Sequence, residues 1–117
     1  MALLDEDVRR IESLGYARER FAMESKGLMV LKSLRHRCVF HDGARCTIYE
    51  DRPAGCRLYP VVFAEYVGTA AMDRMCPFRD EFHLSPESRR GSVNLHHRLI
   101  QEARQRKRVR RSRPSEG

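Results

Sequence analysis

Four cysteines are the residues of this 117-residue chain whose types and spacing could do chemistry. Cys38, Cys46, Cys56 and Cys76 are separated by seven, nine and nineteen residues, so none forms the C-x-x-C pair of a common zinc knuckle. Each lies beside a turn or at the end of an expected strand, where backbone N–H groups can point at a sulfur. Four thiolates suit a tetrahedral zinc site and equally an iron–sulfur cluster. From the residues alone three interpretations stay open, namely a metal site, four buried free thiols, or disulfides.

The expected compartment favours the metal interpretation. The first residues, MALLDEDVRRIE, are acidic where a signal peptide has a basic and then an apolar region. No run of eighteen apolar residues occurs, so the sequence predicts no membrane span. We therefore expect a cytoplasmic protein. In that compartment thiols stay reduced, and clustered cysteines more often bind metal or do chemistry than form disulfides.

The segments that must position the cysteines consist mostly of residues that favour strands and turns. Residues 28–34 and 37–40 are rich in strand formers, and the Asp-Gly of HDGAR (41–45) is a strong turn signal that predicts a hairpin. Pro53 and Gly55 are expected to break regular structure just before Cys56.

Further strands and helices are predicted on either side of this region. Residues 61–67 form the clearest expected strand, and 69–75 are its expected partner after Gly68. Apolar spacing predicts an N-terminal helix over 3–15, ended by a left-handed glycine, and a helical turn is expected around 17–21. Ser85 and Pro86 are typical of a helix start, and this C-terminal helix is expected to run to about Lys107.

These elements predict a small α+β domain with short antiparallel strands, an N-terminal helix and a C-terminal helix. The chain is 41% hydrophobic, which is adequate for a core but not generous, and so small a domain often needs a metal or a disulfide as a staple. We expect a cysteine-rich, metal-stapled domain over residues 1–108. Residues 109–117 have no apolar face and are expected to form a basic, disordered tail.

One stretch carries a family resemblance. The segment CVFHDGARCTIYEDRPAGCRLYP, followed by MCPF, resembles the YkgJ-like cysteine-cluster family, a zinc- or iron-chelating domain of the CxxCxxCC type. The shared pattern is C-x-F, a turn, C-x-I-Y, an R-P pair, C-R-x-Y-P and a later C-P, and LLDEDVRRIESLGY resembles the first helix of the family. The resemblance covers roughly residues 3–80 and implies metal binding through Cys38, Cys46, Cys56 and Cys76. It also implies a further cysteine cluster just before the first helix, which is missing ahead of Met1 in this sequence.

Residues beside the cysteines are candidates for supporting the site. Arg52, with the following proline, would fix the turn, and Arg57 could offset the negative charge that four thiolates leave around a divalent ion. Tyr49 and Tyr59 would pack the loop against the body. The structural alternatives stay open, because the arginines could pair with neighbouring carboxylates and the tyrosines could be core residues with a polar tip.

The sequence gives weaker signals of other chemistry. His36, His41 and His83 lie near cysteines and could replace one as a ligand, although exposed loop histidines are the alternative. No Gly-rich phosphate loop, nucleophile elbow or carboxylate dyad occurs. We therefore do not expect an enzyme. A redox enzyme with an iron–sulfur cluster ranks last, because no substrate or further cofactor site is visible.

The positive charge is concentrated at the C-terminus. Residues 98–117 hold eight Lys or Arg against two Glu, a balance of +6 out of a net +7. The alternative function is therefore a nucleic-acid-associated protein, RNA or DNA, whose metal is structural and whose tail contacts phosphates. The candidate phosphate contacts are Arg104, Arg106, Lys107, Arg108, Arg110 and Arg111. No aromatic residue interleaves this run, so it offers no base-stacking platform.

Overall fold

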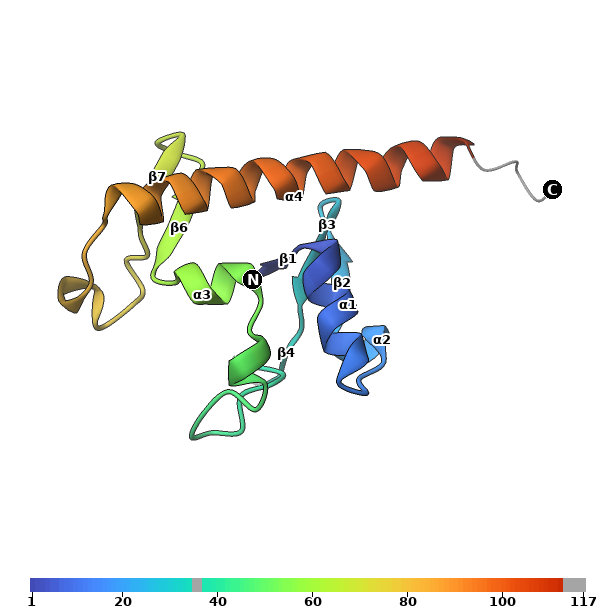
Figure 1. Ribbon diagram of the computed structural model, residues 1–117, viewed down its shortest axis with the longest axis horizontal. Coiled ribbons are helices and arrows are strands. Elements are labelled where there is room, and N and C mark those ends of the chain that lie inside the picture. Colours follow the sequence, from blue (N-terminus) through green and yellow to red (C-terminus); the bar gives the residue numbers. More distant parts are fainter. Residues whose placement is uncertain (35–36, 113–117) are drawn as a thin grey trace.

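The computed structural model describes residues 1–34 and 37–112 of the chain (Figure 1). Its helices are α1 (Asp5–Ser13), α2 (Arg18–Phe21), α3 (Ala54–Leu58) and α4 (Pro86–Ser112), with 3-10 turns at Tyr49–Asp51 and Arg79–Glu81. Its strands are β1 (Ala2–Leu3), β2 (Ala22–Ser25), β3 (Leu28–Leu31), β4 (Ser33–Leu34), β5 (Arg37–Cys38), β6 (Val61–Ala64) and β7 (Thr69–Met72). The expected α+β class, with short antiparallel strands, an N-terminal helix and a C-terminal helix, is confirmed.

The described strands form three small antiparallel sheets. One has the order β1-β3-β2, and the others are the pairs β4-β5 and β6-β7. The β2–β3 hairpin pairs Ser25 with Leu28, so only two residues turn the chain. Lys26 and Gly27 both have positive φ, 52° and 83°, as a tight hairpin loop whose twist matches its strands requires.

Helix α1 follows from its sequence. Three carboxylates lie in its first turn, where the positive end of the helix dipole favours them. Val8 and Ile11 are buried on its inner side, and Gly15, with φ of 105°, stands just beyond its end as expected. The main core lies between α1, α2 and the three-stranded sheet. It consists of Leu3, Val8, Ile11, Phe21, Ala22, Leu31, Phe40 and Ile48.

Helix α4 is longer than expected. Ser85 Oγ accepts a hydrogen bond from the Ser88 N–H at 3.0 Å, which confirms the expected start. The helix then continues to Ser112 instead of ending near Lys107, so residues 109–112 are helical where a disordered tail was expected. Arginine propagates a helix well, and Arg106 and Arg110 form ion pairs with the body, which explains the extension. Residues 113–117 lie outside the described part of the chain.

The length of α4 gives the molecule its elongated shape (Figure 1). A helix of 27 residues is about 40 Å long. The radius of gyration is 15.6 Å, compared with about 13 Å for a compact domain of this size. In the part of the chain that is described, no helix has the combination of length and apolar composition needed to cross a bilayer.

Helix α3 corrects one expectation. Pro53 and Gly55 were expected to break regular structure, but Pro53 is the N-cap of α3 and Gly55 lies inside it. Proline is tolerated at a helix start because no intrahelical partner exists there for its missing N–H. At Gly55 a Cβ would overlap Met1 Sδ, so this glycine lets the N-terminal residue pack close to the helix. Strands β1 and β2 were also not predicted.

Candidate metal centre

Three of the four cysteines come from separate segments and pack against the same core. Cys38 ends β5 and pairs with Ser33 of β4. Cys46 lies opposite His41 in an isolated antiparallel bridge, so the hairpin predicted around the Asp-Gly pair is a single bridge in the structure. Cys56 lies in α3. All three are half-buried against the core cluster, so tertiary packing brings segments far apart in sequence to the same core.

The surroundings of the Cys56 thiol disfavour its ionised form. Burial, followed by the charges of Cys38 and Cys46, raises its pKa to about 11, and the N-terminal amine of Met1 acts in the opposite direction. Cys38 and Cys46 therefore lie within electrostatic reach of Cys56. A bound cation would remove the cost of placing several thiolates together, because it supplies the missing positive charge.

Cys76 lies in different surroundings. It is buried in the turn after β7, where its N–H donates to the carbonyl of Asp73 at 3.2 Å. The nearby Tyr59 hydroxyl is hydrogen-bonded to the Asp73 carboxylate, which, with burial, raises the pKa of Tyr59 to about 12; Cys76 adds a smaller effect in the same direction. Because Cys76 acts on the pKa of Tyr59, the structure associates it with Tyr59 and Asp73.

The arrangement is not a formed four-thiolate site. All four cysteines are free, and no disulfide joins them. Over residues 1–34 and 37–112, no three His, Cys, Asp or Glu side chains are grouped closely enough to hold a metal ion. The structure thus brings Cys38, Cys46 and Cys56 to one region without closing a coordination sphere, and it leaves Cys76 apart.

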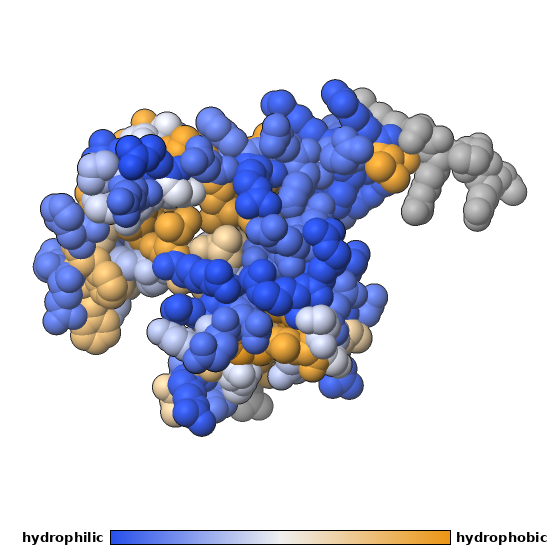
Figure 2. Space-filling model, in the orientation of Figure 1, coloured by the Kyte–Doolittle hydropathy of each residue, from blue (hydrophilic) through white to orange (hydrophobic). Residues whose placement is uncertain are grey.

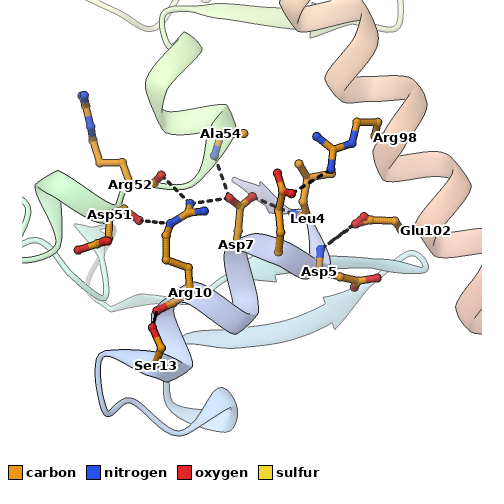
Figure 3. Close-up of polar contacts among 11 residues, drawn as sticks. Leu4, Asp5, Asp7, Arg10, Ser13, Asp51, Arg52, Ala54, Arg98 and Glu102 are labelled. Atoms are coloured by element: carbon orange, nitrogen blue, oxygen red, sulfur yellow. Dashed lines mark hydrogen bonds and ion pairs between the residues drawn. The ribbon is translucent and has the colours of Figure 1, made fainter.

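A buried carboxylate on α1 holds the start of α3 (Figure 3). Asp7 is 1% exposed, and its Oδ1 accepts hydrogen bonds from Arg10 Nη2 at 2.8 Å and from the Ala54 N–H at 3.2 Å. Its Oδ2 accepts the Leu4 N–H at 2.9 Å. Because Ala54 is the first residue of α3, Asp7 fixes the backbone two residues before Cys56.

Arg10 extends this support to the loop between Cys46 and Cys56. Its Nη2 donates to the carbonyl of Arg52 at 3.0 Å, and its Nε donates to the carbonyl of Asp51 at 3.4 Å (Figure 3). A guanidinium presents several donors in a fixed plane, so one side chain satisfies two loop carbonyls and the Asp7 carboxylate. The loop that connects the two cysteines is therefore tied to α1.

Sequence reasoning did not identify Asp7 as a residue that supports the site. One signal was available. Asp7 follows Leu4 by three residues and precedes Ile11 by four, so it lies on the apolar side of the helix. An acidic residue at such a position must find donors inside the protein, because a buried carboxylate without partners is costly.

The residues expected to support the site lie in different surroundings. The Arg52 guanidinium carbon lies 3.9 Å from the centre of the Tyr49 ring, and the Arg52 carbonyl accepts from Arg10. Arg57 is exposed on α3 directly after Cys56. Tyr59 lies beside Asp73 and Cys76.

The candidate histidines contribute little to this region. His41 is exposed, and its Nδ1 accepts the Gly43 N–H at 3.1 Å within its own turn. His83 is exposed. His36 lies outside the described residues. None of the histidines that the structure describes belongs to a group of three ligands.

Cys46 borders a surface groove of about 750 Å³. Tyr16, Ile48 and the 3-10 turn at Tyr49–Asp51 line other parts of the groove. This opening gives an ion or a thiol reagent a route from solvent to one edge of the three-cysteine region.

Comparisons with known proteins agree with the cysteine pattern. Residues 1–77 match the model of the family CxxCxxCC, described as "Putative zinc- or iron-chelating domain". No curated protein and no solved structure gives a significant match. The matched residues contain α1, the three small sheets and all four cysteines.

Proposed function

Because the chain belongs to the CxxCxxCC family of zinc- or iron-chelating domains, we propose that it is a metal-binding module whose ion is held by cysteine thiolates. Cys38, Cys46 and Cys56 form the centre of the proposed site. Cys76 is the fourth thiolate that the chain offers, and the Cys76→Ser variant tests whether it also binds the ion.

One observation carries the proposal. Three cysteines from β5, an isolated bridge and α3 pack against one core, and Cys38 and Cys46 help to raise the pKa of Cys56. Thiols that repel one another when ionised gain the most from a shared cation, which lowers the pKa of every ligand that it binds. The network of Asp7 and Arg10 supports the proposal, because it holds the loop between two of the ligands.

The ion is zinc or iron on the basis of the family. Four protein ligands complete a zinc site. Iron could be bound as a single ion or within an iron–sulfur cluster. Colour and visible absorbance separate these forms, since a zinc site is colourless and an iron–sulfur cluster is brown. In either case binding requires deprotonated thiols, so metal uptake releases protons and couples to folding.

The test is metal content after anaerobic purification, followed by titration of the metal-free protein with Zn²⁺ and Fe²⁺. Single Cys→Ser variants at positions 38, 46 and 56 should each lose most of the bound metal. Met29→Leu is the matched control, because Met29 is another sulfur side chain packed on the same core but supplies no thiolate. It should keep full stoichiometry.

Two outcomes would contradict the proposal. One is full metal content in Cys56→Ser, and the other is equal loss in Met29→Leu. Cys76→Ser distinguishes the two forms of the site. Retention of metal in that variant indicates a three-cysteine centre, and loss indicates that all four cysteines bind.

A further inference from the structure

One face of helix α4 forms ion pairs with the body of the protein. Its ion pairs are Arg98 with Glu6 at 3.3 Å, Arg106 with Asp5 at 3.0 Å, and Arg110 with Glu24. The Glu102 carboxylate also turns inward and accepts the Asp5 N–H at 2.7 Å. The charges on this face are largely neutralised by one another.

A second face of α4 carries positive charge that has no described carboxylate partner. Arg90 and Arg104 are fourteen residues apart, which places them on one stripe, and Lys107 and Arg108 flank it one turn further on. All four side chains are exposed. Arg90 and Arg104 stand about 21 Å apart along the helix axis.

Acidic residues are kept away from this basic stripe. Within α4, Glu102 is turned roughly 160° and Glu87 roughly 100° from Arg104 at ordinary helix geometry. Figure 2 shows blue, hydrophilic residues over most of the part of α4 that projects beyond the body in that view. A one-signed charge array on a rigid helix is a surface that attracts polyanions.

A surface groove beside the stripe adds a second element to it. The groove has a volume of about 430 Å³ and lies between α4 and the β2–β3 turn. Lys26 lines it together with Arg104 and Lys107, and its only acidic lining residue among those described, Glu24, is paired with Arg110. The cations therefore come from two elements that the fold holds side by side.

We infer that this face binds the phosphate backbone of a double-stranded nucleic acid, independently of sequence and of the metal site. Arginines and lysines at regular spacing neutralise phosphates without reading bases. Single strands are bound mainly by stacking on aromatic side chains, and α4 contains no Phe, Tyr or Trp. A membrane surface is disfavoured, because the apolar side of α4 faces β6, β7 and α3 and is not available for lipid.

The inferred contacts differ from those expected from the sequence. Arg104, Lys107 and Arg108 remain, and Arg90 and Lys26 are added. Arg106 and Arg110 are assigned to the body through their ion pairs. The side chain of Arg111 is outside the described part of the structure.

The experiment measures binding of labelled 20-base-pair DNA and RNA duplexes by fluorescence anisotropy between 50 and 200 mM salt. The test variant is Arg104→Gln, Lys107→Gln, Arg108→Gln. The control variant is Arg9→Gln, Arg18→Gln, Arg20→Gln, which removes the same charge from exposed positions on α1 and α2. Circular dichroism and metal content verify that both variants are folded.

We expect the slope of log K against log salt to become less steep by about 2.7 in the test variant, since each lost contact on duplex DNA contributes about 0.9. The control should keep the wild-type slope. If duplex binding weakened equally in both variants, the effect would come from net charge alone, and the inference would be overturned. So would an absence of duplex binding at 50 mM salt, tighter binding to a single strand of equal length, or binding to anionic vesicles without binding to duplex.

Discussion

A buried carboxylate at position 7 joins two segments of the chain that carry the candidate site. Asp7 accepts hydrogen bonds from the first residue of α3 and from Arg10, which in turn holds the loop before Cys56. These contacts are far from local, since Asp7 and Ala54 are 47 residues apart in sequence. At the residue scale the cysteines therefore depend on a polar network as well as on apolar packing.

Replacing Asp7 by Ala should destabilise the protein by about 3 kcal/mol, because two backbone N–H groups and a guanidinium lose their acceptor. Urea unfolding of the metal-free protein measures this change. Glu12→Ala is the control, since its exposed pair with Arg18 is worth less than about 1 kcal/mol. A loss no larger than that of the control would show that the network does not hold the fold.

The raised pKa of Cys56 predicts a pH dependence of the metal-free protein. Its folded pKa of about 11 lies above the ordinary value of 9.0, so the folded state holds this proton more tightly than the unfolded state does. The resulting stability is fully present below about pH 9 and is lost as the pH rises to about 11. Between pH 8 and 11 the melting temperature should fall less steeply in Cys56→Ala than in the wild type. Parallel curves would contradict the assigned burial of this thiol.

Two helices show how differently elements of one chain are specified. Helix α4 starts at a side-chain cap that the sequence predicts, Ser85 followed by Pro86. Helix α3 has no side-chain cap of its own, and its first N–H is satisfied by Asp7 on another element. Gly91 of α4 also lies against α3, because a Cβ there would stand 3.2 Å from Leu58 Cδ2. The two helices are therefore coupled by close packing.

Ser85→Ala should destabilise the protein by about 1 kcal/mol, because the Ser88 N–H loses its capping oxygen. Ser85→Asp should preserve stability, since a carboxylate both caps the helix and suits the positive end of its dipole. Thermal melts of the two variants make the comparison. Equal melting temperatures for Ser85→Ala and Ser85→Asp would argue against the cap.

At the scale of the whole molecule, the small core leaves room for the metal to contribute to folding. The described buried residues are few, and α4 projects beyond the body, so apolar burial per residue is limited. A ligand that binds only the folded state adds its binding free energy to stability.

Metal at a hundred times its dissociation constant should therefore raise the stability of the domain by about 2.7 kcal/mol, which corresponds to about 10 °C in melting temperature. Differential scanning fluorimetry of the metal-free protein with added Zn²⁺ or Fe²⁺ measures the shift. The variant Cys38→Ser, Cys46→Ser, Cys56→Ser should show none. An equal shift in that variant would place the stabilising ion elsewhere.

The sequence by itself determined the local features of this protein. Apolar periodicity gave α1, the Ser-Pro start gave α4, and strand formers with Gly68 gave the β6–β7 hairpin. The cysteine spacing with its C-R-x-Y-P pattern was sufficient to identify the metal-chelating family, which the match over residues 1–77 confirms. These features depend on neighbours in the chain, so short-range patterns record them.

Only the tertiary structure decided which residues meet. It gathered Cys38, Cys46 and Cys56 and left Cys76 with Tyr59, and it divided the arginines of α4 between body and solvent. It also made a helix of the segment after Pro53, because a carboxylate 47 residues earlier in the chain satisfies its first N–H. Such outcomes depend on contacts between distant segments, and no short sequence window contains both partners.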